Sequence, residues 1–170
     1  KKGFDVLIDS LALLKKRGVA FRAVLAGDGG EEAPLKALAA THGVDSLIWF
    51  PGWITQKKPF FEAIDLFCLP SRHEPFGIAL LEAMTQGLPV VASDSEGPLE
   101  IITNGIDGMI VEKGDPAMLA DCLEQLIADP AEAALLARNA YDTVKKHYDL
   151  PVASSKISAA LETIAAGLHL

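Results

Sequence analysis

The chain has 170 residues, half of them hydrophobic and 22% charged, which is typical of a folded globular domain and excludes a disordered chain. Its formal net charge of −8 argues against nonspecific binding of nucleic acid. No apolar stretch approaches the roughly 20 residues that span a bilayer, and no signal-peptide pattern precedes the first expected helix. We therefore expect one domain without a transmembrane segment.

The periodicity of apolar residues and the glycines and prolines that interrupt it predict helices that alternate with short strands. In chain order, the expected elements are a helix (3–17), a strand (20–26), a helix (31–42), a strand (47–50), a short helix (57–63), a strand (64–69), the helix of the motif described below, a strand (88–92), a short helix (97–103), a strand (109–111) and three closing helices (116–128, 130–147 and 152–168).

This alternation is typical of an α/β domain with a doubly wound, Rossmann-like parallel sheet that helices cover on both faces. Ligands of such sheets bind outside the carboxyl ends of the strands. The glycine-rich or polar turns follow the expected strands, at 27–30, 51–53, 70–77 and 93–98. We therefore expect all candidate chemistry at one edge of the sheet.

Cysteine and histidine usage indicates no metal site. Cys68 falls in an expected strand and Cys122 in an expected helix, and two lone cysteines indicate neither a disulfide framework nor a zinc site. The four histidines show no metal-ligand spacing. We expect a reducing, cytoplasmic location and no protein-bound metal.

The most informative segment runs from residue 70 to 93 and sets Glu74 and Glu82 eight positions apart around a Pro-Phe-Gly turn. A strand, a polar turn and an apolar helix in succession present free backbone N–H groups and a helix dipole, which favour an anion. The N–H groups of Phe76 and Gly77 are candidates to bind phosphate or sugar oxygens, because glycine lets a ligand approach closely. Glu82 interrupts an apolar helix, so we expect it to have a partner or to face a ligand.

Two other interpretations are weaker. A glycoside hydrolase places its carboxylates about 5–5.5 Å or about 6.5–9.5 Å apart across an open cleft. Eight residues across a turn and a helix separate these two glutamates by about 9 Å or more, and Glu82 is expected inside the helix. The turn at 27–30 suggests a dinucleotide fingerprint, but Glu32 stands where that fingerprint needs a small residue.

The glutamate pair resembles the glutamate–seven–glutamate motif of retaining GT-B glycosyltransferases, family 4 (group 1). Further segments are similar to the same family and occur in its order: Lys1–Ile8, Leu25–Gly29, Gly97–Ile102, Asn104–Gly108 and Gly114–Pro116. Together they cover nearly all 170 residues, which is more specific than any single motif.

The resemblance implies a role for each candidate residue. Lys2 corresponds to a lysine that contacts the donor diphosphate. Glu74 corresponds to the catalytic-site glutamate that accepts a sugar hydroxyl near the transferring carbon, and Glu82 to the one that accepts the ribose hydroxyls. Trp53 and Ile54 correspond loosely to the loop of the base pocket, although packing or an interface is an equal alternative for Trp53.

Each of these residues also has an interpretation without a role in ligand binding. A solvated lysine is the alternative for Lys2, and an exposed loop carboxylate is the alternative for Glu74. Lys1 and Arg72 are expected to be solvated residues rather than anion ligands.

The resemblance further implies that the chain is the C-terminal, donor-binding half of a GT-B fold. Such a domain binds a nucleotide sugar, for example a UDP- or GDP-sugar. It transfers a hexosyl or similar group, with retention and without a metal, to an acceptor glycan or lipid held by an N-terminal domain. Polysaccharide or lipopolysaccharide synthesis at the cytoplasmic face of the membrane, with peripheral association, is the implied setting. A nucleotide- or phosphate-binding module without transfer activity stays open as an alternative.

The family's domain has one strand more than this sequence. The first strand of the domain is absent here, as is the acceptor domain, so no residue can be assigned as acceptor base and the chain alone is expected to be inactive. That strand would lie between the expected strands at 20–26 and 64–69. We therefore expect these two strands not to pair directly.

Overall fold

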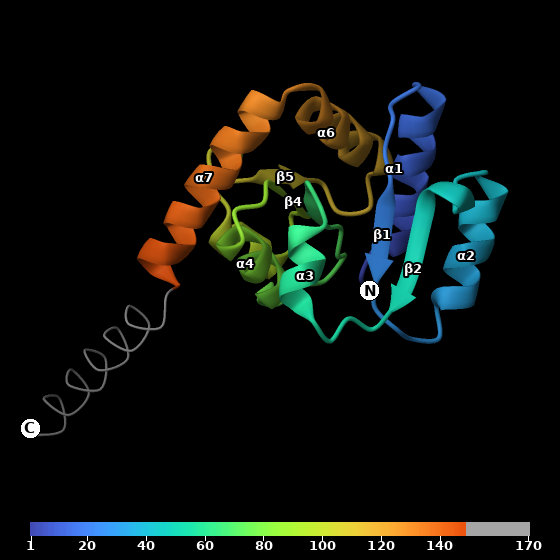
Figure 1. Ribbon diagram of the computed structural model, residues 1–170, viewed down its shortest axis with the longest axis horizontal. Coiled ribbons are helices and arrows are strands. Elements are labelled where there is room, and N and C mark those ends of the chain that lie inside the picture. Colours follow the sequence, from blue (N-terminus) through green and yellow to red (C-terminus); the bar gives the residue numbers. More distant parts are fainter. Residues whose placement is uncertain (149–170) are drawn as a thin grey trace, which may run out of the picture.

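The computed structural model describes residues 1–148, and the helix expected over 152–168 lies outside the described residues. The order of helices and strands agrees with the expectation from the sequence (Figure 1). The elements are α1 (Phe4–Lys16), β1 (Ala23–Ala26), α2 (Glu32–Thr41), the 3-10 turn η1 (Asp45–Leu47), β2 (Ile48–Gly52), α3 (Lys57–Glu62), β3 (Phe67–Leu69), α4 (Ile78–Thr85), β4 (Val90–Ser93), α5 (Glu96–Ile101), β5 (Met109–Val111), α6 (Pro116–Ala128) and α7 (Pro130–His147).

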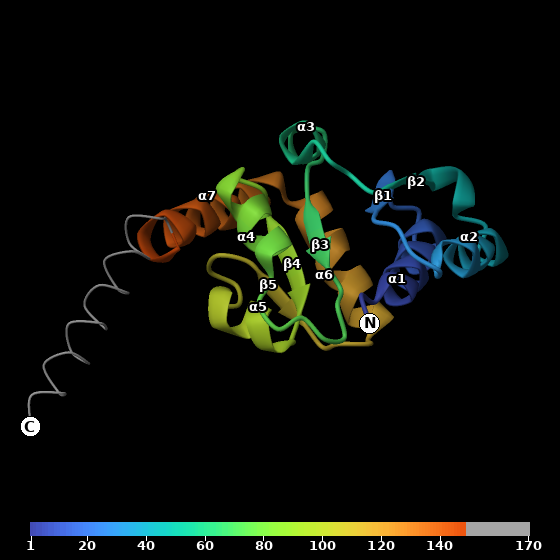
Figure 2. The same cartoon turned by 90° about the horizontal axis from the view of Figure 1, so that it is seen from below.

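The strands form two parallel sheets rather than the one expected. β1 pairs with β2, and β3, β4 and β5 form a second sheet in that order. No ladder joins β1 to β3 within residues 1–148, which confirms that these two strands do not pair directly. Figure 2 shows the two sheets side by side, with β1 and β3 as the facing edges.

Strand boundaries differ from the expectation at both edges. β1 starts at Ala23 rather than Ala20, because its register with β2 begins at the pair Ala23 and Ile48. β2 continues through Pro51 and Gly52, which were expected to form a turn. β3 starts at Phe67, so the first half of the strand expected at 64–69 is not part of a ladder.

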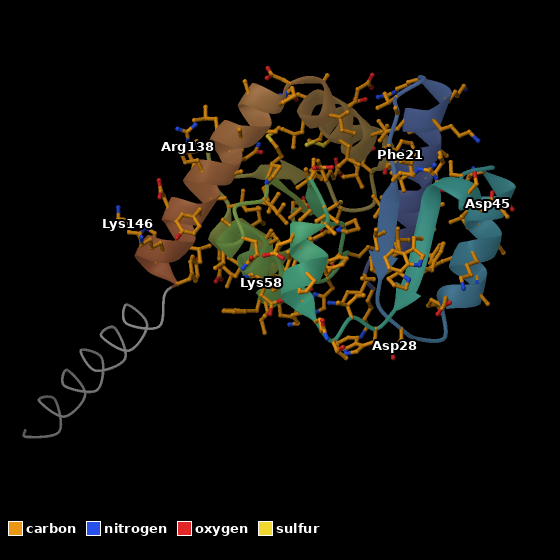
Figure 3. All side chains as sticks on the ribbon, viewed as in Figure 1. Phe21, Asp28, Asp45, Lys58, Arg138 and Lys146 are labelled. Carbon is orange, nitrogen blue, oxygen red and sulfur yellow. The ribbon has the colours of Figure 1, made fainter. Side chains whose placement is uncertain are left out.

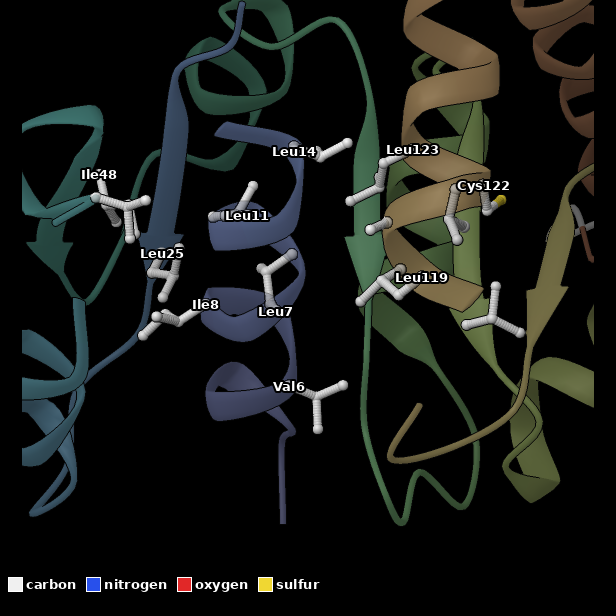
Figure 4. Close-up of a cluster of buried hydrophobic side chains, with 14 of the residues drawn as sticks. Val6, Leu7, Ile8, Leu11, Leu14, Leu25, Ile48, Leu119, Cys122 and Leu123 are labelled. Carbon is white, nitrogen blue, oxygen red and sulfur yellow. The ribbon is translucent and has the colours of Figure 1, made fainter. Parts of the chain in front are cut away.

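The molecule has two halves, one built on the sheet of β1 and β2 and the other on the sheet of β3, β4 and β5, and helix α1 packs between them. Its apolar stripe is buried and includes Ile8, Leu11 and Leu14. Figure 4 shows α1 between β1, which contributes Leu25, and α6, which contributes Leu123. Burial of side chains of this size stabilises the fold by about 1.5–3 kcal/mol each.

A second cluster of buried side chains lies between α4, α7 and the sheet of β3, β4 and β5. It includes Leu80 and Met84 of α4, Val90 of β4 and Ala140 of α7. Figure 2 shows α4 and α7 beside this sheet, away from α1 and α2. Helix α4, which carries Glu82, is therefore anchored on the sheet of β3, β4 and β5.

The closing helices begin where local sequence signals require it. The Asp115 carboxylate accepts hydrogen bonds from the N–H groups of Ala117 and Met118 at 2.8 and 2.9 Å, and the Asp129 carboxylate caps α7 in the same way. Each cap is followed by a proline, which suits the first helical position because that position needs no N–H donor.

Candidate functional site

One cavity of about 1700 Å³ opens between the two halves of the molecule. Six of the seven site residues expected from the sequence line it: Lys2, Trp53, Ile54, Glu74, Phe76 and Glu82. The seventh, Gly77, lies between two lining residues. The folded chain therefore brings the expected site residues together at the carboxyl ends of the strands.

Glu74 and Lys2 form an ion pair across this cavity. The Lys2 Nζ lies 2.8 Å from Glu74 Oε2, and the Glu74 side chain is 14% exposed against 62% for Lys2. Burial raises the pKa of Glu74, but the lysine and the backbone N–H groups of Gly77 and Phe76 outweigh it, so the pKa lies below its ordinary value. Glu74 is therefore held as a carboxylate beside an exposed cation.

The backbone of the turn before α4 donates a hydrogen bond to the side chain of Glu74, which lies in the same turn. Gly77 adopts a left-handed conformation with φ of 91° as the N-cap of α4, and its N–H donates to Glu74 Oε1 at 3.2 Å. The sequence suggested instead that the N–H groups of Phe76 and Gly77 face a ligand. In this structure they face the Glu74 carboxylate, because a carboxylate three residues before the helix start can accept hydrogen bonds from the free N–H groups there.

Glu82 has the partner that its place in an apolar helix requires. Its Oε1 lies 2.6 Å from the Nζ of Lys57, the first residue of α3, and both side chains line the cavity. The sequence carries no local signal for this pair, because the two residues lie on different helices, 25 positions apart. Lys57 is thus a site residue that sequence reasoning missed.

Arg72 is exposed, as expected for a solvated residue, and it is also held in an ion pair with Asp5. Its two terminal nitrogens donate to the two carboxylate oxygens of Asp5 at 2.7 and 2.6 Å. This bidentate pair lowers the pKa of Asp5, mainly through the hydrogen bond to Arg72. It ties the loop after β3 to the first turn of α1, close to Lys2.

Gly97 closes the site from the side of α5. Its N–H donates to the Glu74 carbonyl at 2.8 Å, and a Cβ at this position would lie 2.4 Å from the carbonyl carbon of Phe76. Only a residue without a side chain permits this approach. Gly97 belongs to one of the segments that resemble the family, but the contact itself is not readable from the sequence.

Apolar side chains form an exposed rim around the cavity. Trp53 is 67% exposed, Ile78 is 61% exposed and Phe76 is 55% exposed, and all three line the opening. Asp28, labelled in Figure 3, follows β1 and also lines the cavity. A rim of this composition suits a flat, partly apolar group such as a base or a sugar face.

Residues 1–148 were also compared with what a metal site and a membrane-spanning helix require. These residues contain no group of three or more histidine, cysteine, aspartate or glutamate side chains placed to hold a metal ion. None of their helices is long and apolar enough to cross a membrane.

A parallel α/β fold with paired lysines and glutamates at the carboxyl edge of its strands has the form of a ligand-binding α/β domain. The profile of the family described as glycosyl transferases group 1 matches residues 1–143. The chain therefore belongs to this family.

Curated relatives of this chain are named as transferases of sugar groups. The lipopolysaccharide core biosynthesis glycosyltransferase LpsE of Rhizobium meliloti is 39% identical over 144 residues, which are 85% of this chain and 41% of the relative. The alpha-D-kanosaminyltransferase of Streptomyces kanamyceticus is 31% identical over 160 residues, 93% of this chain and 42% of the relative. The chain thus spans less than half the length of these relatives.

Solved structures show the same fold. Anabaena HepE in complex with UDP is 29% identical and superposes with a TM-score of 0.87 over 95% of this chain and 45% of HepE. The C-terminal domain of the group 1 glycosyltransferase LpcC from Francisella tularensis is 28% identical, with a TM-score of 0.78 over 88% of this chain and 80% of that domain. The chain has the α/β fold of the C-terminal domain of GT-B glycosyltransferases.

Proposed function

We propose that the chain binds the nucleotide-sugar donor, for example a UDP- or GDP-sugar, of a retaining glycosyltransferase. The observation that carries this proposal is the cavity at the carboxyl edge, which is lined by Lys2, Glu74 and Glu82. HepE, a fold neighbour, has been solved with UDP and with UDP-glucose, which supports a nucleotide sugar as the ligand.

Each residue has a chemical task in this proposal. The Lys2 ammonium neutralises the diphosphate, for which it must leave Glu74. Glu74, freed from that pair, accepts a hydroxyl of the sugar next to the carbon that is transferred. Glu82 accepts the ribose hydroxyls, and Trp53 and Ile54 border the base. These contacts bind and orient the donor, and no metal takes part in them.

The acceptor is held elsewhere in the protein. No residue of the described cavity is assigned as an acceptor base, and several relatives are named for lipopolysaccharide core synthesis. The proposed acceptor is therefore a glycan or lipid bound by a second, N-terminal domain, with the enzyme at the cytoplasmic face of a membrane. Both substrates must be held in register for transfer, so the chain alone is proposed to be inactive.

The same proposal includes a strand between β1 and β3. The cavity continues from the site into the space between these two strands, where Leu7, Leu11 and Leu123 line it. The facing edges of β1 and β3 carry no ladder within the described residues, and unpaired backbone groups in a sheet interior cost about 1–3 kcal/mol each.

The position of Lys1 indicates which segment fits this space. Its carbonyl accepts the N–H of Arg72 at 2.9 Å, so the backbone at Lys1 runs beside the segment that follows β3. We propose that the residues before Lys1 in the natural polypeptide form a parallel strand there.

Calorimetric titration of the chain with UDP and GDP, with and without EDTA, tests the donor site. We expect saturable binding of one or both that EDTA leaves unchanged. Strict dependence on magnesium would contradict the metal-free part. Binding of inorganic phosphate as tightly as of UDP would favour the alternative, a phosphate-binding module without transfer activity.

A further inference from the structure

Lys57 lies beside Glu82, one of the carboxylate side chains that line the cavity. It is the first residue of α3 and follows the loop after β2, while Glu82 is the fifth residue of α4. The Lys57 Nζ lies 2.6 Å from Glu82 Oε1. The two side chains are 53% and 32% exposed, so the pair is open to a ligand in the cavity.

The ion pair with Lys57 occupies one oxygen of the Glu82 carboxylate, and the other oxygen can still accept a hydrogen bond. Among residues 1–148, Lys57 is the donor to Oε1, and Oε2 accepts no hydrogen bond. A carboxylate that is ion-paired through one oxygen has a fixed orientation and still offers a strong acceptor on the other side. Oε2 is therefore ready to receive a hydroxyl group.

The negative charge in and around the cavity gives a second reason to expect a lysine at position 57. The chain carries a net charge of −8, and the proposed ligand adds a diphosphate to a cavity that contains Glu74 and Glu82. Each of these carboxylates has one lysine within 2.8 Å, Lys2 for the first and Lys57 for the second. When Lys2 turns to the diphosphate, Lys57 still neutralises Glu82.

We propose that Lys57 is a positioning residue for the nucleotide. It holds Glu82 so that Oε2 accepts a ribose hydroxyl, and it cancels a charge that would otherwise repel the diphosphate. This inference rests on the proposed function, because it assigns a task to a further residue of the same site. It predicts that discrimination between ribose and deoxyribose depends on a residue that does not itself contact the ribose.

The neighbouring lysine provides a matched control. Lys58 follows Lys57 on α3, its Nζ lies 3.7 Å from Glu62 Oε1, its side chain is 75% exposed, and it does not line the cavity. Lys57→Met and Lys58→Met therefore change the net charge and the helix composition equally. Lys57→Met removes the 2.6 Å contact with Glu82 in the cavity, whereas Lys58→Met removes a 3.7 Å contact with Glu62 outside it.

The test is calorimetric titration of wild type, Lys57→Met, Lys58→Met, Glu82→Gln and the double variant Lys57→Met/Glu82→Gln with UDP or GDP, whichever wild type binds. The same titrations are repeated with the 2′,3′-dideoxy nucleotide. We expect Lys57→Met to weaken binding of the ribonucleotide about tenfold, the net contribution of a charge-assisted hydrogen bond. Lys58→Met should change it less than twofold.

The double variant and the dideoxy ligand identify how Lys57 acts. We expect the double variant to bind no more weakly than Glu82→Gln, and Lys57→Met to have a smaller effect on the dideoxy nucleotide. Equal effects of Lys57→Met and Lys58→Met, additive losses in the double variant, or an equal loss for both ligands would each overturn the inference. Failure of wild type to bind either nucleotide is a different result, which overturns the proposed function.

Discussion

The backbone N–H of Gly97 donates a 2.8 Å hydrogen bond to the carbonyl of Glu74. This bond joins the start of α5 to the turn that carries the Glu74 carboxylate, although the two residues are 23 positions apart (97 − 74). It places α5 so close to the turn that the backbone of Phe76 occupies the space of a side chain at position 97. The conformation of the proposed sugar-binding turn therefore depends on a residue in the first turn of α5.

Gly97→Ala is expected to displace this turn. The new methyl group would lie 2.4 Å from the carbonyl carbon and oxygen of Phe76, so the backbone must shift. Overpacking of this kind costs about 1–3 kcal/mol. We expect a loss of that size in urea unfolding and weaker nucleotide binding. Gly30→Ala is the matched control, because position 30 has open space around it, and a similar loss there would contradict the explanation.

The two motif glutamates are expected to have separable effects. Glu82→Ala should weaken binding of a nucleoside diphosphate by about 1.5–3 kcal/mol, or roughly tenfold to a hundredfold, because a ribose hydroxyl loses a charged acceptor. Glu74→Ala should mainly reduce the preference for the intact sugar donor over the free diphosphate. Titration of both variants with UDP or GDP and with the matching sugar donor measures this. Equal losses for the free diphosphate would refute the division of roles.

The Glu74 ion pair should make stability depend on pH in a defined direction. Its pKa in the folded chain lies below the ordinary value of 4.5, so folding favours the carboxylate. The stabilisation is complete above the unfolded pKa and is lost as pH falls through the folded pKa. Urea unfolding of wild type and Glu74→Gln at several pH values between about 7 and 3 should show the difference shrinking below pH 4.5. A difference that grows in acid would contradict this assignment.

The space between β1 and β3 should accept a strand. A fusion that adds about five or six valine and isoleucine residues before Lys1, the usual length of a strand, should raise the melting temperature by several degrees. It should also slow hydrogen exchange of β1 and β3 amides. The same extension with a central proline is the control, because proline removes a ladder donor. No difference between the two extensions, or a dimer of the chain that fills the space, would refute the proposal.

The chain alone is expected to transfer no sugar. Incubation with UDP- or GDP-sugars and candidate glycan or lipid acceptors should yield no glycosylated product, because the acceptor has no binding domain. Robust turnover by the purified chain would refute the two-domain assignment.

The order of elements could be predicted from the sequence because its signals are local. The helical spacing of Leu11 and Leu14, the aspartate caps before Pro116 and Pro130, and the apolar run at 88–92 each act within a few residues. The meeting of Lys2, Glu74 and Glu82 at one edge was also predictable, since the carboxyl ends of parallel strands lie together.

Only the tertiary structure decided which side chains meet within that edge. The pairs Lys57 with Glu82 and Arg72 with Asp5 join segments that are 25 and 67 positions apart, and the division into two sheets depends on which strand edges come into register. Contacts of this kind depend on helix packing and strand order, which are set by burial of the whole core and not by the residues that make the contact.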